Sequence, residues 1–316
     1  MRKPPPNRGL FIIALLALAC RSASSRSSPG LFGSDAVVDA PQLPAGGAAA
    51  GTAGRAMLGG VGGGAVQDAP ITPAGYGLPP GSSIKVLWIG NSLTGAPEAM
   101  GAATGWTPMP DRLVPMLAEL GITMTYGSVI LGGAECSTHA ANPTTMAEIA
   151  NPTYGIVNFQ SSYDNAGDAA AYTTAVRPLY TAAHNAGSIA LFEGIWEFGG
   201  FGSYQLDYGG PLNPAAENAV EGAAAALPGS FPVQVGHCWQ AVKNRRAALI
   251  PKMHADGVHQ SVLGEYFNAL VYARFFSARA VRGITSVHPL VVAASTADER
   301  QLLRETVDGC VTIFYR

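Results

Sequence analysis

The chain has 316 residues, and its 19 basic and 21 acidic side chains give a formal net charge of −2. This balance excludes a basic nucleic-acid-binding surface, which needs clustered positive charge to displace counterions from phosphates. Hydrophobic residues make up 48% of the chain, which allows a sizeable core and excludes an acidic, self-repelling disordered chain.

Residues 1–20 have the pattern of an export signal. Arg2, Lys3 and Arg8 precede an unbroken apolar run over 10–19. A helix needs about 20 apolar residues to cross a bilayer core, so this run fits a signal peptide better than a spanning helix. Residues 16–20, Leu-Ala-Leu-Ala-Cys, resemble the lipobox of bacterial lipoproteins, although Ala17 stands where leucine is usual. The resemblance implies a lipid anchor on Cys20 in the cell envelope, with plain secretion and a retained anchor as the alternatives.

Residues 21–80 predict a tether between that anchor and a folded domain. They contain 13 Gly, 12 Ala, 7 Pro and 6 Ser. Such a composition buries too little apolar surface to offset the entropy of ordering the chain. The glycine run at 59–64 follows no strand and opens no helix, so it is a linker and not a dinucleotide-binding loop.

From residue 81 to 316 the pattern is that of one folded domain. Apolar, β-branched runs predict strands at 84–89, 122–131, 154–159, 189–195 and 231–235. Helical spacing predicts helices at 113–120, 169–186, 215–227, 262–276 and 298–307. Near-continuous apolar strands that alternate with helices indicate a three-layer α/β/α fold with a five-stranded, mainly parallel sheet.

Ligands of an open parallel sheet bind beyond the carboxyl ends of its strands, so the residue after the first strand is a candidate nucleophile. Residues 90–94 read Gly-Asn-Ser-Leu-Thr, which places Ser92 on a sharp turn. The sequence matches neither the Gly-x-Ser-x-Gly elbow nor a phosphate-binding loop with lysine. A serine that only caps a helix is the alternative.

Asp256 and His259 stand together directly before the last long apolar helix. An imidazole can take the proton of a serine hydroxyl, and a carboxylate on its other nitrogen fixes the tautomer. The spacing Asp-x-x-His alone is weak, but with Ser92 upstream it predicts a Ser-His-Asp triad.

The two motifs together resemble those of the SGNH hydrolase (GDSL esterase/lipase) superfamily. Residues 86–94 are similar to that family's first block, and 256–261 to its last. The resemblance covers residues 84 to about 278 and implies a flavodoxin-like fold and an acyl-enzyme mechanism. Ser92 is then the nucleophile, His259 the base and Asp256 its orienting partner, and neither a metal nor another cofactor is required.

The resemblance also implies an oxyanion hole built from several N–H donors. They are the backbone N–H of Ser92, that of Gly132 or Gly133, and a side-chain amide from the family's third block. That block normally reads Gly-x-Asn, whereas residues 157–162 here read Val-Asn-Phe-Gln-Ser-Ser. Gln160 is the predicted third donor, and Asn158 is the reserve.

Four further residues are candidate substrate contacts on the loops at the same sheet edge: Asn91, Trp106, His139 and Trp196. For His139 a structural histidine is the alternative, and for Trp106 and Trp196 an aromatic that covers the sheet end. His254 lacks the family spacing for the base. Of the cysteines after Cys20, we expect Cys238 and Cys310 to pair, although the sequence alone does not determine connectivity.

The sequence therefore predicts a serine esterase that removes O-acetyl or other short-acyl groups, with carbohydrate as the substrate class implied by the family. Its predicted partners are an acylated carbohydrate or small ester, and the membrane through the lipid anchor only. A catalytically silent glycan-binding or structural envelope lipoprotein is one alternative, supported by the missing Gly-x-Asn. An esterase for lipids or small acyl esters is another.

Overall fold

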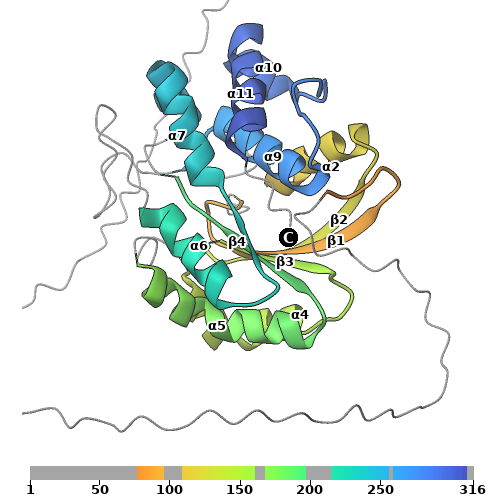
Figure 1. The fold of residues 1–316 in the computed structure, drawn as a ribbon, viewed down its shortest axis with the longest axis vertical. Coiled ribbons are helices and arrows are strands. Elements are labelled where there is room, and N and C mark those ends of the chain that lie inside the picture. The colour runs from red at the N-terminus through yellow and green to blue at the C-terminus, as the bar shows by residue number, and fades with distance from the viewer. Residues whose placement is uncertain (1–76, 96–108, 161–167, 197–214, 256–258, 312–316) are drawn as a thin grey trace, which may run out of the picture. The chain divides into compact units, whose positions relative to one another are not determined.

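The structure is a computed structural model that describes residues 77–95, 109–160, 168–196, 215–255 and 259–311 (Figure 1). The predicted signal peptide, Cys20 and nearly all of the predicted tether lie outside these residues. None of the helices in the described ranges is long and apolar enough to cross a membrane.

The centre of the fold is a five-stranded sheet in the order β2-β1-β3-β4-β5, in which every pairing is parallel. The strands are β1 (Ser83–Gly90), β2 (Thr123–Ile130), β3 (Ile156–Gln160), β4 (Ile189–Glu193) and β5 (Phe231–Val233). The prediction of a parallel sheet is confirmed, and this strand order is the flavodoxin-like one. All carboxyl strand ends therefore lie at one edge.

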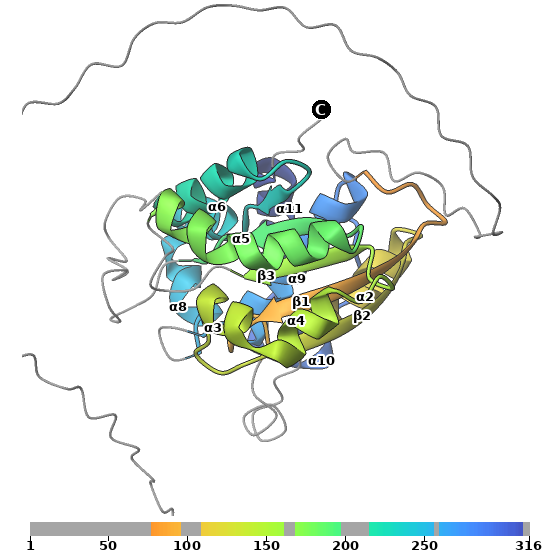
Figure 2. The ribbon, with the colours of Figure 1, turned by 90° about the horizontal axis from the view of Figure 1, so that it is seen from below.

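Helices cover both faces of the sheet (Figures 1 and 2). On one face lie α3 (Cys136–Ala141), α4 (Pro143–Ile149), α5 (Ala169–Asn185) and α6 (Ala215–Ala226). On the other lie α2 (Met109–Glu119), α7 (Val235–Arg246), α8 (Ile250–Met253), α9 (Val262–Ser277), α10 (Pro289–Ala294) and α11 (Ala297–Cys310), with a 3-10 turn at Ala247–Leu249. Alternate residues of β1 enter the two cores: Leu87 and Ile89 pack toward α5, and Val86 and Trp88 toward α9.

Helix α9 is the central helix of its layer, because every residue except Val262 and Arg274 is buried. Ser261 caps its start by accepting hydrogen bonds from the N–H groups of Leu263 and Gly264. An apolar helix of this kind must be covered on its outer side as well. Helices α10 and α11 provide that cover, which explains the predicted helix at 298–307.

Three expectations differ from the structure. The predicted strand at 231–235 ends at Val233, because Val235 already begins α7. Helix α7 itself was not predicted, since its polar sequence with Lys243, Arg245 and Arg246 shows no clear apolar stripe. Helix α2 begins at Met109, four residues before the predicted start.

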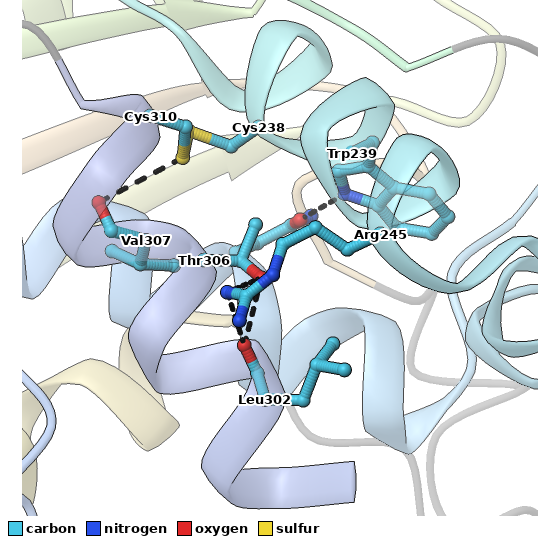
Figure 3. The surroundings of a disulfide bond; sticks show 8 residues. Cys238, Trp239, Arg245, Leu302, Thr306, Val307 and Cys310 are labelled. Atoms are coloured by element: carbon cyan, nitrogen blue, oxygen red, sulfur yellow. Dashed lines mark hydrogen bonds between the residues drawn. A yellow bond between two sulfur atoms is a disulfide. The ribbon is translucent and has the colours of Figure 1, made fainter.

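A disulfide joins α7 to α11 through Cys238 and Cys310, which confirms the expected pairing (Figure 3). Arg245 of α7 adds a hydrogen bond of 2.8 Å from Nη1 to Thr306 Oγ1 of α11. The disulfide closes a loop of 72 residues that contains His259. Cys136 is a free, buried cysteine, and burial raises its thiol pKa to about 12, which disfavours the nucleophilic thiolate.

Removing the disulfide with the double substitution Cys238→Ala and Cys310→Ala should lower the free energy of unfolding. For a closed loop of 72 residues the loop-entropy model gives about 4 kcal/mol. Denaturant unfolding with and without reductant measures the effect, and reductant should destabilise the wild type but not the variant. Equal unfolding midpoints for the two proteins would contradict a stabilising role.

Candidate active site

The turn that follows β1 is shaped by a close approach at Gly90. A Cβ atom there would collide with Thr94 Oγ1 and lie 2.8 Å from Gln160 Oε1. Those two atoms are themselves joined by a 2.8 Å hydrogen bond in which the Thr94 hydroxyl donates. Glycine is therefore required at 90 so that the turn can fold back over the end of β3.

Asn91 fixes the conformation of this turn with three hydrogen bonds. Its backbone N–H donates to Gln160 Oε1 (3.2 Å), its Oδ1 accepts from the Leu93 N–H (3.0 Å), and its Nδ2 donates to the Ala134 carbonyl (3.1 Å). The side chain is buried and its polar atoms are engaged within the protein. In this structure Asn91 joins the serine turn to the 131–135 loop, and its predicted contact with substrate stays a prediction.

Ser92 and His259 lie in direct contact. The Ser92 Oγ atom is 2.8 Å from His259 Nε2, although the two residues are 167 positions apart in the chain. This is hydrogen-bond distance, so the hydroxyl can donate to a neutral imidazole that accepts at Nε2. The juxtaposition expected from the two sequence motifs is present.

A small antiparallel pairing holds the segment that carries His259. The N–H of Ala255 donates to the His259 carbonyl (2.8 Å), and the N–H of Ser261 donates to the Met253 carbonyl (2.7 Å). His254 pairs with Gln260 in the resulting bridge. Asp256 lies outside the described residues, so its place beside His259 stays a prediction.

Unoccupied backbone donors lie on the two loops that Asn91 joins. Within the described ranges, the N–H groups of Ser92, Gly132 and Gly133 donate to no protein acceptor. Gly133 has a φ of +66°, which favours glycine, and both glycines are exposed. Donors of this kind are what an oxyanion hole requires.

Gln160 is held with its amide nitrogen uncommitted. Its Oε1 accepts from the Asn91 N–H and the Thr94 hydroxyl, which fixes the orientation of the carboxamide. Its Nε2 is buried and has no partner in the described part of the chain. A buried amide without an acceptor is costly, so Nε2 is suited to a ligand oxygen.

Three other predicted contacts lie inside the fold. His139 donates from Nε2 to the Gly90 carbonyl (3.0 Å), is only 2% exposed, and has its pKa lowered by burial. It supports the end of β1, which agrees with the structural alternative. Trp196 is buried and stacks on Trp239, with ring centroids 4.9 Å apart, so it belongs to the core. Trp106 lies outside the described residues.

Asn158, the reserve oxyanion donor, is also committed elsewhere. It belongs to a buried polar cluster in which its Nδ2 donates to Glu193 Oε2 (2.9 Å) and its Oδ1 accepts from the Tyr272 hydroxyl (2.8 Å). Burial raises the pKa of Glu193 to about 7, although Asn158 and Tyr272 stabilise the carboxylate. This cluster was not predicted, because a single Glu at the end of an apolar strand gives no sequence signal.

No group of three or more metal-binding side chains occurs in the parts of the chain that the structure describes. The arrangement around Ser92 consists of a hydroxyl, an imidazole and N–H donors. The imidazole can accept a proton from the hydroxyl, and the N–H donors can stabilise a developing oxyanion.

No protein-family model and no curated protein matches the sequence. A solved structure of a DUF4886 family protein from Bacteroides uniformis is similar, with a TM-score of 0.56 at 15% identity over 72% of this chain and 94% of that one. The two proteins share a fold.

Two further solved structures have lower TM-scores. A candidate SGNH hydrolase from Slackia heliotrinireducens gives a TM-score of 0.44 at 25% identity, over 61% of this chain and 99% of that one. The acetyl xylan esterase AlAXEase gives a TM-score of 0.44 at 13% identity, over 60% of this chain and 98% of that one.

The raised pKa of Glu193 predicts a pH-dependent stability. Between the ordinary pKa of a glutamate, 4.5, and the pKa of about 7 in the folded protein, the folded protein binds more protons than the unfolded one, so ionisation at higher pH destabilises the fold. The substitution Glu193→Gln removes the pH dependence of stability that comes from this carboxyl. From pH 4.5 to 8 the variant should gain about 3 kcal/mol relative to the wild type. Urea unfolding at several pH values measures this, and a stability difference that is constant with pH would contradict it.

Proposed function

We propose that this protein is a serine esterase of the SGNH type that acts through an acyl-enzyme. The observation that carries the proposal is the 2.8 Å contact between Ser92 Oγ and His259 Nε2 at the carboxyl edge of a parallel sheet. Nucleophile and base within hydrogen-bond reach are the first requirement for acyl transfer by serine.

In the proposed acylation step, Ser92 Oγ attacks the ester carbonyl carbon while its proton moves to His259 Nε2. The carbonyl oxygen becomes an oxyanion that accepts hydrogen bonds from the backbone N–H of Ser92, from that of Gly132 or Gly133, and from Gln160 Nε2. When the tetrahedral intermediate collapses, the C–O bond to the alcohol breaks and His259 returns the proton to the leaving oxygen.

Deacylation follows the same path with water as the nucleophile. His259 takes a proton from water, the hydroxide adds to the acyl carbon, and the Ser92 ester bond then breaks. The imidazolium returns its proton to Ser92 Oγ, and a carboxylic acid leaves. Asp256 is assigned to the Nδ1 side of His259, where a carboxylate stabilises the imidazolium.

The proposed substrate is an O-acetyl or other short-acyl ester on a carbohydrate, and this part rests on the family resemblance of the first and last motifs. The alternative is a silent glycan-binding lipoprotein on the same fold. The observation in its favour is that residues 157–162 lack the Gly-x-Asn of the family's third block. The uncommitted Nε2 of Gln160 supports the esterase instead.

We further propose export of the protein, with lipidation of Cys20 as the anchor. The Cys238–Cys310 disulfide supports this proposal, because such bonds persist in oxidising compartments outside the cytosol. Labelling of the full chain with a radioactive or clickable fatty acid in a bacterial host tests it. Label on the wild type that is lost in Cys20→Ser is expected, and equal labelling of both would rule out this anchor.

Replacing the nucleophile tests the esterase itself. The full chain is expected to hydrolyse p-nitrophenyl acetate, and Ser92→Ala should lose at least about 10³-fold in kcat. Equal hydrolysis rates for the wild type and Ser92→Ala would favour the alternative, a silent glycan-binding lipoprotein. A comparison of acetylated xylan with longer acyl esters then distinguishes a carbohydrate esterase from a lipid esterase.

Gln160→Glu tests the third oxyanion donor. The carboxylate keeps an acceptor for Asn91 N–H and Thr94 Oγ1 but lacks the Nε2 donor. Loss of one oxyanion donor costs about 10²–10³ in kcat, so a drop of that size with little change in KM is expected. Gln240→Glu, at a buried glutamine of α7, is the matched control. A kcat within threefold of the wild type would exclude Gln160 as a donor.

A further inference from the structure

Two parallel hydrogen bonds join the serine turn to the histidine segment. Beside the bond between Ser92 and His259, Gln260 Nε2 donates to the Leu93 carbonyl at 2.8 Å. Both bonds connect residues 167 positions apart, so neighbours on one segment pair with neighbours on the other. Gln260 has no exposed surface, which protects its bond from exchange with water.

The backbone of Gln260 is fixed independently of its side chain. It lies in the bridge with His254, directly between the carbonyl of His259 and the N–H of Ser261, which are both paired. Gly264 in the first turn of α9 allows close packing here, because a Cβ atom would lie 2.9 Å from Gln260 Cβ. Because the Gln260 backbone is fixed, its side chain can hold the Leu93 carbonyl in a defined position.

We propose that Gln260 is a positioning residue that sets the distance and angle between the His259 imidazole and the Ser92 hydroxyl. The inference rests on the proposed esterase function. The chain His259–Gln260–Leu93–Ser92 forms a closed ring with the Ser92–His259 bond, so the Gln260 amide limits how far the two reacting groups can separate. The role belongs to proton transfer and not to substrate binding, because both ends of the Gln260 bond are protein atoms.

A second tie keeps the surrounding helices together without Gln260. Arg112 of α2, the first described helix after the serine turn, pairs with Glu265 of α9, the helix after His259. The distance from Arg112 Nε to Glu265 Oε2 is 2.6 Å and both side chains are buried. Loss of the Gln260 bond is therefore expected to loosen the local alignment and to leave the two helices packed.

The test compares Gln260→Met with Gln240→Met in the full chain. Methionine is close to glutamine in size but cannot donate, and Gln240 is a buried glutamine whose Nε2 bonds only to Asn244 of its own helix in the described ranges. A misplacement of about 1 Å between reacting groups can cost 10²-fold. We expect Gln260→Met to lower kcat for p-nitrophenyl acetate by about 10- to 100-fold with KM within twofold, and Gln240→Met to retain wild-type kcat.

Stoichiometric labelling of Ser92 by a fluorophosphonate gives the fraction of folded, competent enzyme in each preparation. A structural role alone would lower that fraction and leave kcat per labelled site unchanged, which would overturn the proposal. Should Gln260→Met not fold, Gln260→Leu is used in its place, since its uncharged side chain also cannot donate to the Leu93 carbonyl. A wild type that hydrolyses no ester and takes no label would overturn the esterase function itself, and with it this inference.

Discussion

The hydrogen bond between Ser92 and His259 is the interaction on which the proposed site depends. It joins the turn after β1 to the segment between α8 and α9, across 167 positions. A parallel sheet allows this because all its carboxyl ends lie at one edge, and α9 brings His259 to that edge from the far end of the chain. The Gln260 amide joins the same two segments, and the buried Arg112–Glu265 pair joins the helices α2 and α9 that follow them.

Gln160 shows how one side chain can serve both the fold and the site. Its oxygen accepts the Asn91 N–H and the Thr94 hydroxyl and so holds the serine turn in place. The same two bonds leave its nitrogen available. On the neighbouring strand, in register with Gln160, lies Glu193, whose carboxyl belongs to the cluster with Asn158 and Tyr272. The sheet face toward α9 therefore carries polar groups close to the site, whereas the face toward α5 is largely apolar.

The sheet and the long helices could be predicted because their signals are local. Apolar runs such as 84–89 and the spacing in 262–276 follow directly from burial on one or two faces. Ser92 and His259 could be paired because their residue types suit acyl transfer and because the two motifs together resemble those of one superfamily. The roles of Asn91, His139, Asn158 and Trp196 could not be predicted, since a polar or aromatic residue gives the same sequence signal whether its side chain faces a ligand or folds inward. Helix α7 was missed because its contacts with α11, including the disulfide, are long-range.

The cover that α11 gives to α9 has a consequence for shortened forms of the protein. The family-like motifs end near residue 278, but Leu303, Val307 and Cys310 complete the core around α9, and Arg304 Nη1 donates to the Tyr266 hydroxyl (3.3 Å). A truncation at the end of the recognisable motifs would strip one side of the helix that follows His259 and leave Cys238 without its partner. The core around α9 therefore extends well past the last family-like motif, to the end of α11.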